Sequence, residues 1–396
     1  MIGFLFFCFF GILVGFFAGL LPGVHPNQIY FLIISLGLFV ETKTLIVFLA
    51  SLATANIIFN YIPTLFLSLP DTNTVLNVLP GHKLVLKGKG LKALKINLIS
   101  FLLAALLIFA TSPLLFLITE KLQKFAKPFI PYFLGTLVIV TILVEKGERK
   151  VFALLLFLLS GVLGLVTLNG KGLKQDVAIF CILTGLFGIP NLLFVQKESI
   201  PKQDTSEDDV KLDVKLILLS LLCGTLSAFL PGAGESQIGL MVSLLVRTTE
   251  EESLSVLSSL NAANMLLTVI MLASTGKIRS GLAEALSLTS IQDFMLLFFG
   301  AVLFSAGISS LVCFLLGKKL LNFLEKVNYG NFSKIIIASL IILALISCGS
   351  WGLLLLITST SIGVLPILLH VKRTNNMGFF ILPTLLFYSK LDVLWI

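Results

Sequence analysis

Long apolar runs separated by short polar patches extend along the whole chain, and many of them approach the roughly 20 residues that cross a bilayer as a helix. The pattern predicts an all-α polytopic membrane protein with roughly 10–14 membrane segments. Its expected apolar segments are Ile2–Leu21, Leu45–Leu69, Ile96–Leu117, Phe129–Val144, Val151–Leu168, Val177–Val195, Leu216–Leu230, Leu254–Ala273, Phe294–Leu316, Ile335–Ser347, Leu353–Leu369 and Phe379–Trp395.

Two small polar patches, one in each half of the chain, follow apolar runs. The first begins at Pro22-Gly23 and the second at Pro231-Gly232. Proline lacks an N–H group and glycine permits unusual backbone angles, so each patch should end one helix and free backbone polar groups. Because such groups must be satisfied in a membrane, the patches predict broken or re-entrant helices that line a binding site.

The two patches belong to an internal repeat. At an offset of 209 residues the matches are Gly15/Gly224, Pro22/Pro231, Gly23/Gly232, Gln28/Gln237 and Ile29/Ile238. With the offset shortened by one residue, 49–56 matches 257–264. The expected organisation is a first membrane half (1–195), a cytoplasmic hydrophilic linker (196–215) and a second membrane half (216–396). Counting the crossings predicts that the two repeats are inverted.

A new helix that starts after each patch would direct its N–H groups and the positive end of its dipole at an anion. Two such ends meeting near the membrane midplane could hold a carboxylate, and freed carbonyl groups could hold Na⁺. The predicted side-chain donors in the patches are Asn27, Gln28, Ser236 and Gln237, and those on neighbouring helices are Asn56, Asn264, Ser51 and Ser259.

Each of these polar residues also has a purely structural interpretation. Serine and asparagine are common helix caps, and asparagine on a membrane helix often bonds to a neighbouring helix. Duplication at equivalent places favours binding. Glu235 and His25 are ionisable residues within the patches, so either could carry a coupling proton, or serve only as a capping carboxylate and an interfacial histidine.

Composition agrees with the membrane assignment, since 57% of residues are hydrophobic, 12% are charged and mean hydropathy is +1.07. The net charge of +8 reflects loop orientation, and the excess of lysine in the connector 70–95 favours the cytoplasmic side. Nucleic-acid binding is not indicated. No lysine or arginine precedes Lys43, so the first apolar run lacks the basic start of a signal peptide and is expected to be retained.

Several of these motifs resemble the large membrane subunit of the tripartite tricarboxylate transporters. They are the paired Pro-Gly patches, Leu69-Pro70-Asp71-Thr72-Asn73-Thr74, Lys87-Gly88-Lys89-Gly90 and Asn261-Ala262-Ala263-Asn264. The resemblance implies cation-driven uptake of carboxylates, with a small membrane subunit and an extracytoplasmic substrate-binding protein as partners. The positions that match the motifs of this family are Pro22, Gly23, Asn27, Asn56, Pro231, Gly232, Gly234, Ser236 and Asn264.

Departures from the family pattern indicate a divergent, short branch. Asp71 stands where glycine is expected, His25-Pro26 replaces Gly-Pro, and Lys277-Ile278-Arg279-Ser280 replaces a Gly-Ile-Pro-Gly-like element. The sequence therefore predicts a secondary transporter of the cytoplasmic membrane, moving a small organic anion with Na⁺ or H⁺ and needing no cofactor. The alternatives are a channel, a protein that moves lipid or another solute, an intramembrane enzyme, for which no GxSxG or HExxH motif is present, and a structural scaffold.

Overall fold

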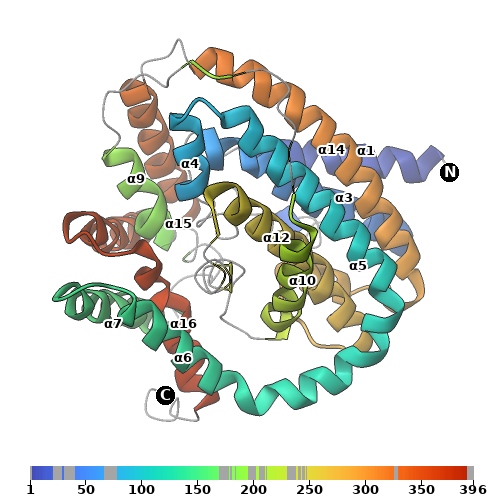
Figure 1. The fold of residues 1–396 in the computed structure, drawn as a ribbon. Coiled ribbons are helices and arrows are strands. Elements are labelled where there is room, and N and C mark those ends of the chain that lie inside the picture. Colours follow the sequence, from blue (N-terminus) through green and yellow to red (C-terminus); the bar gives the residue numbers. More distant parts are fainter. Residues whose placement is uncertain are drawn as a thin grey trace.

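The computed structural model describes residues 2–20, 29–30, 41–66, 78–168, 178, 181–182, 184–194, 202–204, 210, 212–229, 238–239, 242, 246, 248–324 and 329–389. Within these ranges the regular elements are all helical, as predicted, and no strand occurs. Figure 1 shows the helices gathered around α12 (Glu250–Thr275).

Seven helices in the described ranges are long and apolar enough to cross a membrane. They are α1 (Ile2–Leu20), α3 (Thr42–Phe66), α5 (Gly90–Ala126), α7 (Arg149–Leu168), α12, α14 (Met295–Leu324) and the second part of α15 (Tyr329–Leu368). Shorter apolar helices include α6 (Ile130–Leu143), α10 (Val214–Phe229) and the first part of α15. The remaining helices named below are α4 (Val78–Leu86), α9 (Ile189–Leu193) and α16 (Gly378–Tyr388). The chain is therefore a multi-pass membrane protein.

The expected apolar segment Leu45–Leu69 contains two asparagines and a proline. α3 continues as one helix through Asn56, Asn60 and Pro63. All three side chains are buried in the protein, away from lipid. The Thr64 hydroxyl donates to Asn60 Oδ1 at 2.9 Å, so neighbouring protein groups satisfy polar atoms there.

Six helices form a first group with a duplicated packing scheme. In the first half α1 packs along α3, and in the second half α10 packs along α12. The third helix of each half crosses over, because α5 packs on α12 whereas α14 packs on α3. The two predicted repeats are thus interlocked, and neither could keep its core without the other.

Glycines set the close approach of α1 to α3. A Cβ atom at Gly11, Gly15 or Gly19 would lie 2.6 Å from a backbone carbonyl oxygen of α3, those of Phe48, Leu52 and Asn56 respectively. The second repeat uses the same device, since a Cβ atom at Gly224 would lie 2.5 Å from Ala263 Cβ. Small residues spaced by four let membrane helices pack backbone to backbone.

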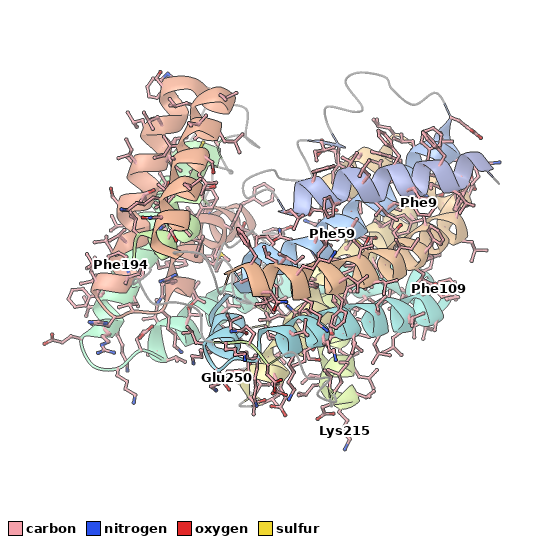
Figure 2. The ribbon with its side chains drawn as sticks, turned by 90° about the horizontal axis from the view of Figure 1, so that it is seen from above. Phe9, Phe59, Phe109, Phe194, Lys215 and Glu250 are labelled. Carbon is pink, nitrogen blue, oxygen red and sulfur yellow. The ribbon has the colours of Figure 1, made fainter. Side chains whose placement is uncertain are left out.

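A second group consists of α6, α7, α9, α15 and α16. In Figure 2, Phe194 marks this group, while Phe9, Phe59 and Phe109 mark the first. Here α7 packs on α16, and α15 packs on α9 and the π-helical turn Thr184–Gly188 that precedes it.

The second group is also duplicated, which the sequence comparison missed. Ser160 and Gly164 of α7 lie against α16 at Gly378 and Phe379. Ser359 and Gly363 of α15, both 199 residues later, lie in the same way against the turn at Gly185 and Leu186. The internal repeat therefore extends beyond the Pro-Gly patches.

Candidate functional site

Both Pro-Gly patches fall outside the part of the chain that the structure describes. This applies to Pro22, Gly23, His25, Asn27, Gln28, Pro231, Gly232, Gly234, Glu235, Ser236 and Gln237. The remaining predicted residues are described: Ser51 and Asn56 lie on α3, and Ser259 and Asn264 lie on α12.

α3 and α12 are the most buried of the seven described helices that could span a membrane. In each, 94% of the most apolar 18 residues are buried inside the protein, against 22% for α5 and 33% for α7. Both nevertheless carry many buried polar side chains: Ser51, Thr54, Asn56, Asn60 and Thr64 on α3, and Ser255, Ser258, Ser259, Asn261 and Thr268 on α12. Polar groups are costly to bury without partners, so two repeat-related helices that share this character indicate a functional interior.

Asn56 has unsatisfied hydrogen-bonding capacity. Its side chain is 2% exposed, and its Nδ2 donor has no hydrogen-bond partner among the described residues. The backbone carbonyl of the same residue faces Gly19 of α1, the last glycine of that packing face. An amide donor in this position is available to a ligand.

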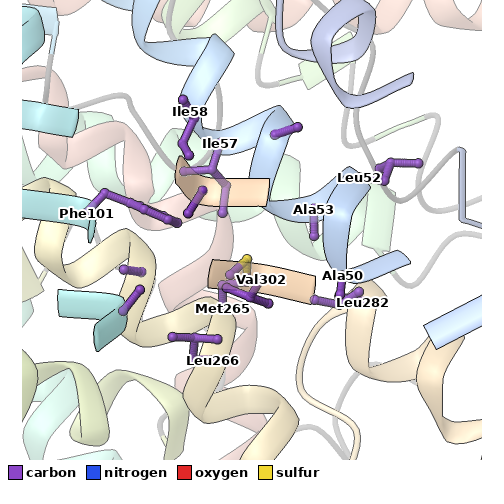
Figure 3. Packing of buried hydrophobic residues seen from close by; sticks show 14 of the residues in the cluster. Ala50, Leu52, Ala53, Ile57, Ile58, Phe101, Met265, Leu266, Leu282 and Val302 are labelled. Atoms are coloured by element: carbon purple, nitrogen blue, oxygen red, sulfur yellow. The ribbon is translucent and has the colours of Figure 1, made fainter. Parts of the chain in front are cut away.

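The helices that carry Asn56 and Asn264 meet next to these residues. Thr54 Oγ1 lies 4.0 Å from Met265 Sδ and also donates to the Ala50 carbonyl at 2.8 Å. Figure 3 shows Ala53 and Ile57 of α3 in the same core as Met265 of α12.

The residues that flank each patch are fixed against these two helices. Gly19, three residues before Pro22, touches α3 at Asn56 and Asn60. Gly239, two residues after Gln237, lies against Leu257 and Leu260 of α12, one turn before Asn264. Described residues on the flank of each patch therefore pack against an asparagine-bearing helix.

The two predicted serines are alike in their hydrogen bonding. Both the Ser51 and the Ser259 hydroxyls are buried with no hydrogen-bond partner among the described residues, and Ser51 lies beside the Cys8 thiol of α1. The neighbouring Ser255 instead accepts a hydrogen bond from Ser100 of α5 at 2.8 Å. Both predicted serine hydroxyls are therefore available to a ligand or cation.

α3 and α12 run in opposite directions where they approach α4. Leu65, near the end of α3, and Leu254, near the start of α12, both lie next to Gly81. Figure 2 places Glu250 and Lys215, at the starts of α12 and α10, on the same side of the molecule. In contrast to α3 and α12, α1 and α3 are parallel, because Gly11, Gly15 and Gly19 meet successive turns of α3 in order.

Sequence reasoning missed a set of hydrogen bonds between the linker and the connector 70–95, called the latch below. Gln203 of the linker is buried, accepts a hydrogen bond from Gly90 N at 3.0 Å and donates to the Val85 carbonyl at 2.9 Å. Asp204 N donates to the Gly88 carbonyl at 2.7 Å, where Gly88 has a φ of +75° that favours glycine.

Ion pairs extend this latch to α12. Lys87 pairs with Glu250 at 3.3 Å and Lys92 with Glu251 at 2.8 Å. The sequence did contain a signal for the ion pairs, because the basic Lys-Gly-Lys-Gly connector could pair with three consecutive glutamates. It contained no signal for Gln203, because a single glutamine in a charged linker belongs to no periodic pattern.

Many membrane transport proteins are duplicated bundles of membrane helices with a polar interior. The model of the tripartite tricarboxylate transporter TctA family matches residues 5–378. The chain belongs to this family, whose members are membrane components of tripartite tricarboxylate transport and normally work with a small membrane subunit and a periplasmic binding protein. The predicted family is confirmed.

A relative from Methanocaldococcus jannaschii, described as uncharacterized protein MJ1079, is 28% identical over 395 residues. The match covers 96% of this chain and 98% of the relative, so the two sequences are similar over nearly their whole lengths. No solved structure matches the chain.

Proposed function

We propose that this protein is a secondary active transporter that moves a small carboxylate across the cytoplasmic membrane, coupled to Na⁺ or H⁺. The observation that carries the proposal is the pair of buried, polar, repeat-related helices α3 and α12, each packed against a glycine that flanks a Pro-Gly patch. A family of transporter components is consistent with a protein that is not an enzyme.

In this proposal the substrate lies where the two patches approach α3 and α12. Backbone N–H groups after Pro22-Gly23 and Pro231-Gly232, with Gly234 permitting close approach, bind the carboxylate oxygens. Side chains of Asn27, Gln28, Ser236 and Gln237 add hydrogen bonds. The unpartnered Asn56 amide supports a donor role for Asn56, and the repeat assigns the equivalent role to Asn264.

Coupling can use one of two chemistries at this place. Na⁺ would bind backbone carbonyl groups freed at the patches, together with the Ser51 and Ser259 hydroxyls. A proton would be carried by His25 or Glu235. Because neither hydroxyl has a partner in the described segments, Ser51 and Ser259 are the first residues to test for Na⁺.

Alternating access follows from the interlocked repeats in this proposal. The opposite directions of α3 and α12 support inverted repeats, formed by 1–195 and 216–396 around the cytoplasmic linker 196–215. Inverted repeats can exchange conformations around a fixed central site, exposing it to one side and then the other. The basic connector and the Lys87 and Lys92 ion pairs then lie on the cytoplasmic side.

The proposal is tested by uptake of labelled small carboxylates into liposomes that contain purified variants. Asn56→Ala and Asn264→Ala should each raise the apparent KM about tenfold, the loss that follows from removing one hydrogen bond of about 1.4 kcal/mol. Ser361→Ala is the control, because this exposed hydroxyl bonds only to the Ile357 carbonyl of its own helix at 2.9 Å. Wild-type KM in both asparagine variants would argue against the site.

A further inference from the structure

Two basic turns pack together at one end of the second helix group. The first, Glu145–Lys150, joins α6 to α7, and the second, His370–Met377, joins α15 to α16. Val371 is buried against Ala153 and Leu156 of α7. Lys372 N donates to Glu145 Oε1 at 2.7 Å, which fixes one turn on the other.

The joined turns carry a large excess of positive charge. Their five cationic side chains are Lys146, Arg149, Lys150, Lys372 and Arg373, and their acids are Glu145 and Glu148. The Glu145 carboxylate is already engaged by the Lys372 backbone. No ion pair within the described residues involves any of these cations. All of them except Arg373 are exposed.

Beside these cations lie buried polar groups that lack partners. Asn376 is 0% exposed, and neither its Oδ1 nor its Nδ2 has a partner among the described residues. The same holds for Asn375 Oδ1 and Thr374 Oγ1. Burial also lowers the pKa of the half-buried Arg373 guanidinium. Two of these unpartnered atoms, Asn376 Nδ2 and Thr374 Oγ1, are donors, and together with the Arg373 guanidinium they form a candidate anion site.

We propose that these two turns bind the phosphate of an anionic membrane phospholipid. Arg373 and the Asn376 and Thr374 donors bind the phosphate oxygens, and Arg149, Lys150 and Lys372 add surrounding charge. The apolar surface directly beyond the turns favours a lipid over a free phosphate ion. Val151 and Leu155 of α7 and Leu368 of α15 are exposed, which suits acyl chains that run along both helices.

The proposed site is separate from the carboxylate site. It lies on α7, α15 and α16, whereas the candidate transport residues lie on α3 and α12. A lipid bound there would join the α6–α7 turn to the α15–α16 turn, and thus the two predicted halves of the chain, at the membrane surface.

The test measures binding of fluorescent phosphatidylglycerol to the purified full-length protein in a neutral detergent, with phosphatidylcholine as the neutral probe. The double variant Lys150→Gln/Arg373→Gln should weaken phosphatidylglycerol binding at least about tenfold, because each basic residue contributes to attraction of anionic lipid. The matched control is Lys318→Gln/Lys319→Gln, which removes the same charge from exposed residues at the end of α14. It should change binding less than about twofold.

Three results would overturn the proposal. One is equal loss in both double variants, which would indicate general electrostatic attraction. Another is equal affinity for phosphatidylcholine. The third is displacement of the lipid by inorganic phosphate at low millimolar concentration, which would assign the site to a free anion. If the double variant does not fold, Lys150→Gln/Arg373→Lys replaces it. This variant keeps a positive charge at position 373, so its loss of phosphatidylglycerol binding should be smaller than the loss of about tenfold expected above.

Discussion

Gly15→Ala tests whether α1 and α3 pack backbone to backbone. A Cβ atom at this position would lie 2.6 Å from the Leu52 carbonyl oxygen and 2.7 Å from Ala55 Cβ. The ordinary contact distance is about 3.5 Å, so the helices would have to separate by about 0.9 Å along this face. Overpacking of this kind costs about 1–3 kcal/mol, whereas alanine is intrinsically favoured over glycine in a helix by about 1 kcal/mol.

The expected net result is a loss of stability of about 1 kcal/mol or more. Thermal unfolding in detergent can be followed with a thiol-reactive fluorescent dye, because Cys8, Cys181 and Cys313 are buried and become reactive when the protein opens. The control is Gly300→Ala in the interior of α14, where a Cβ atom would meet nothing within 4 Å. An unfolding temperature for Gly15→Ala equal to or above that of Gly300→Ala would refute the packing argument.

Further predictions concern the repeat and the latch. Gly224→Ala should destabilise the protein as Gly15→Ala does, because its Cβ would lie 2.5 Å from Ala263 Cβ; an unchanged unfolding temperature would break the equivalence of the two repeats. Gln203→Ala removes two hydrogen bonds of about 1 kcal/mol each, so limited proteolysis should cleave the linker faster than in wild type. Lys92→Glu should lower the free energy of unfolding by up to about 1 kcal/mol, and the added change Glu251→Lys should restore it. If the second change does not restore stability, the 2.8 Å ion pair is not the cause of the loss.

The apolar pattern predicted most membrane helices because helix length across a bilayer is a simple physical requirement. Pro63 lies inside one of these helices, where burial among neighbouring helices allows α3 to continue. The sequence indicated a repeat around Gly15 and Gly224, where several residues match in register. It did not indicate the repeat of Ser160-x3-Gly164 and Ser359-x3-Gly363, because two small residues in an apolar background give little signal at a different offset.

The candidate site was predictable only in part. Asn56 and Asn264 stood out as repeated amides on apolar helices, and both proved to lie on the most buried pair. The exchange of third helices between the halves, α5 onto α12 and α14 onto α3, leaves no trace in hydropathy because either partner would bury the same apolar area. Gln203 could not be found either, since its partners are backbone groups more than a hundred residues earlier.

The most direct test of the central claim is uptake of labelled citrate and succinate into liposomes that contain the purified protein, with Na⁺ and proton gradients imposed separately. The assay is run with the protein alone and with its candidate small membrane subunit and binding protein. The account predicts saturable accumulation above the external concentration that requires one of the two gradients and is impaired by Asn56→Ala. Uptake that only equilibrates the carboxylate, does not saturate and ignores both gradients would indicate a channel and contradict the account.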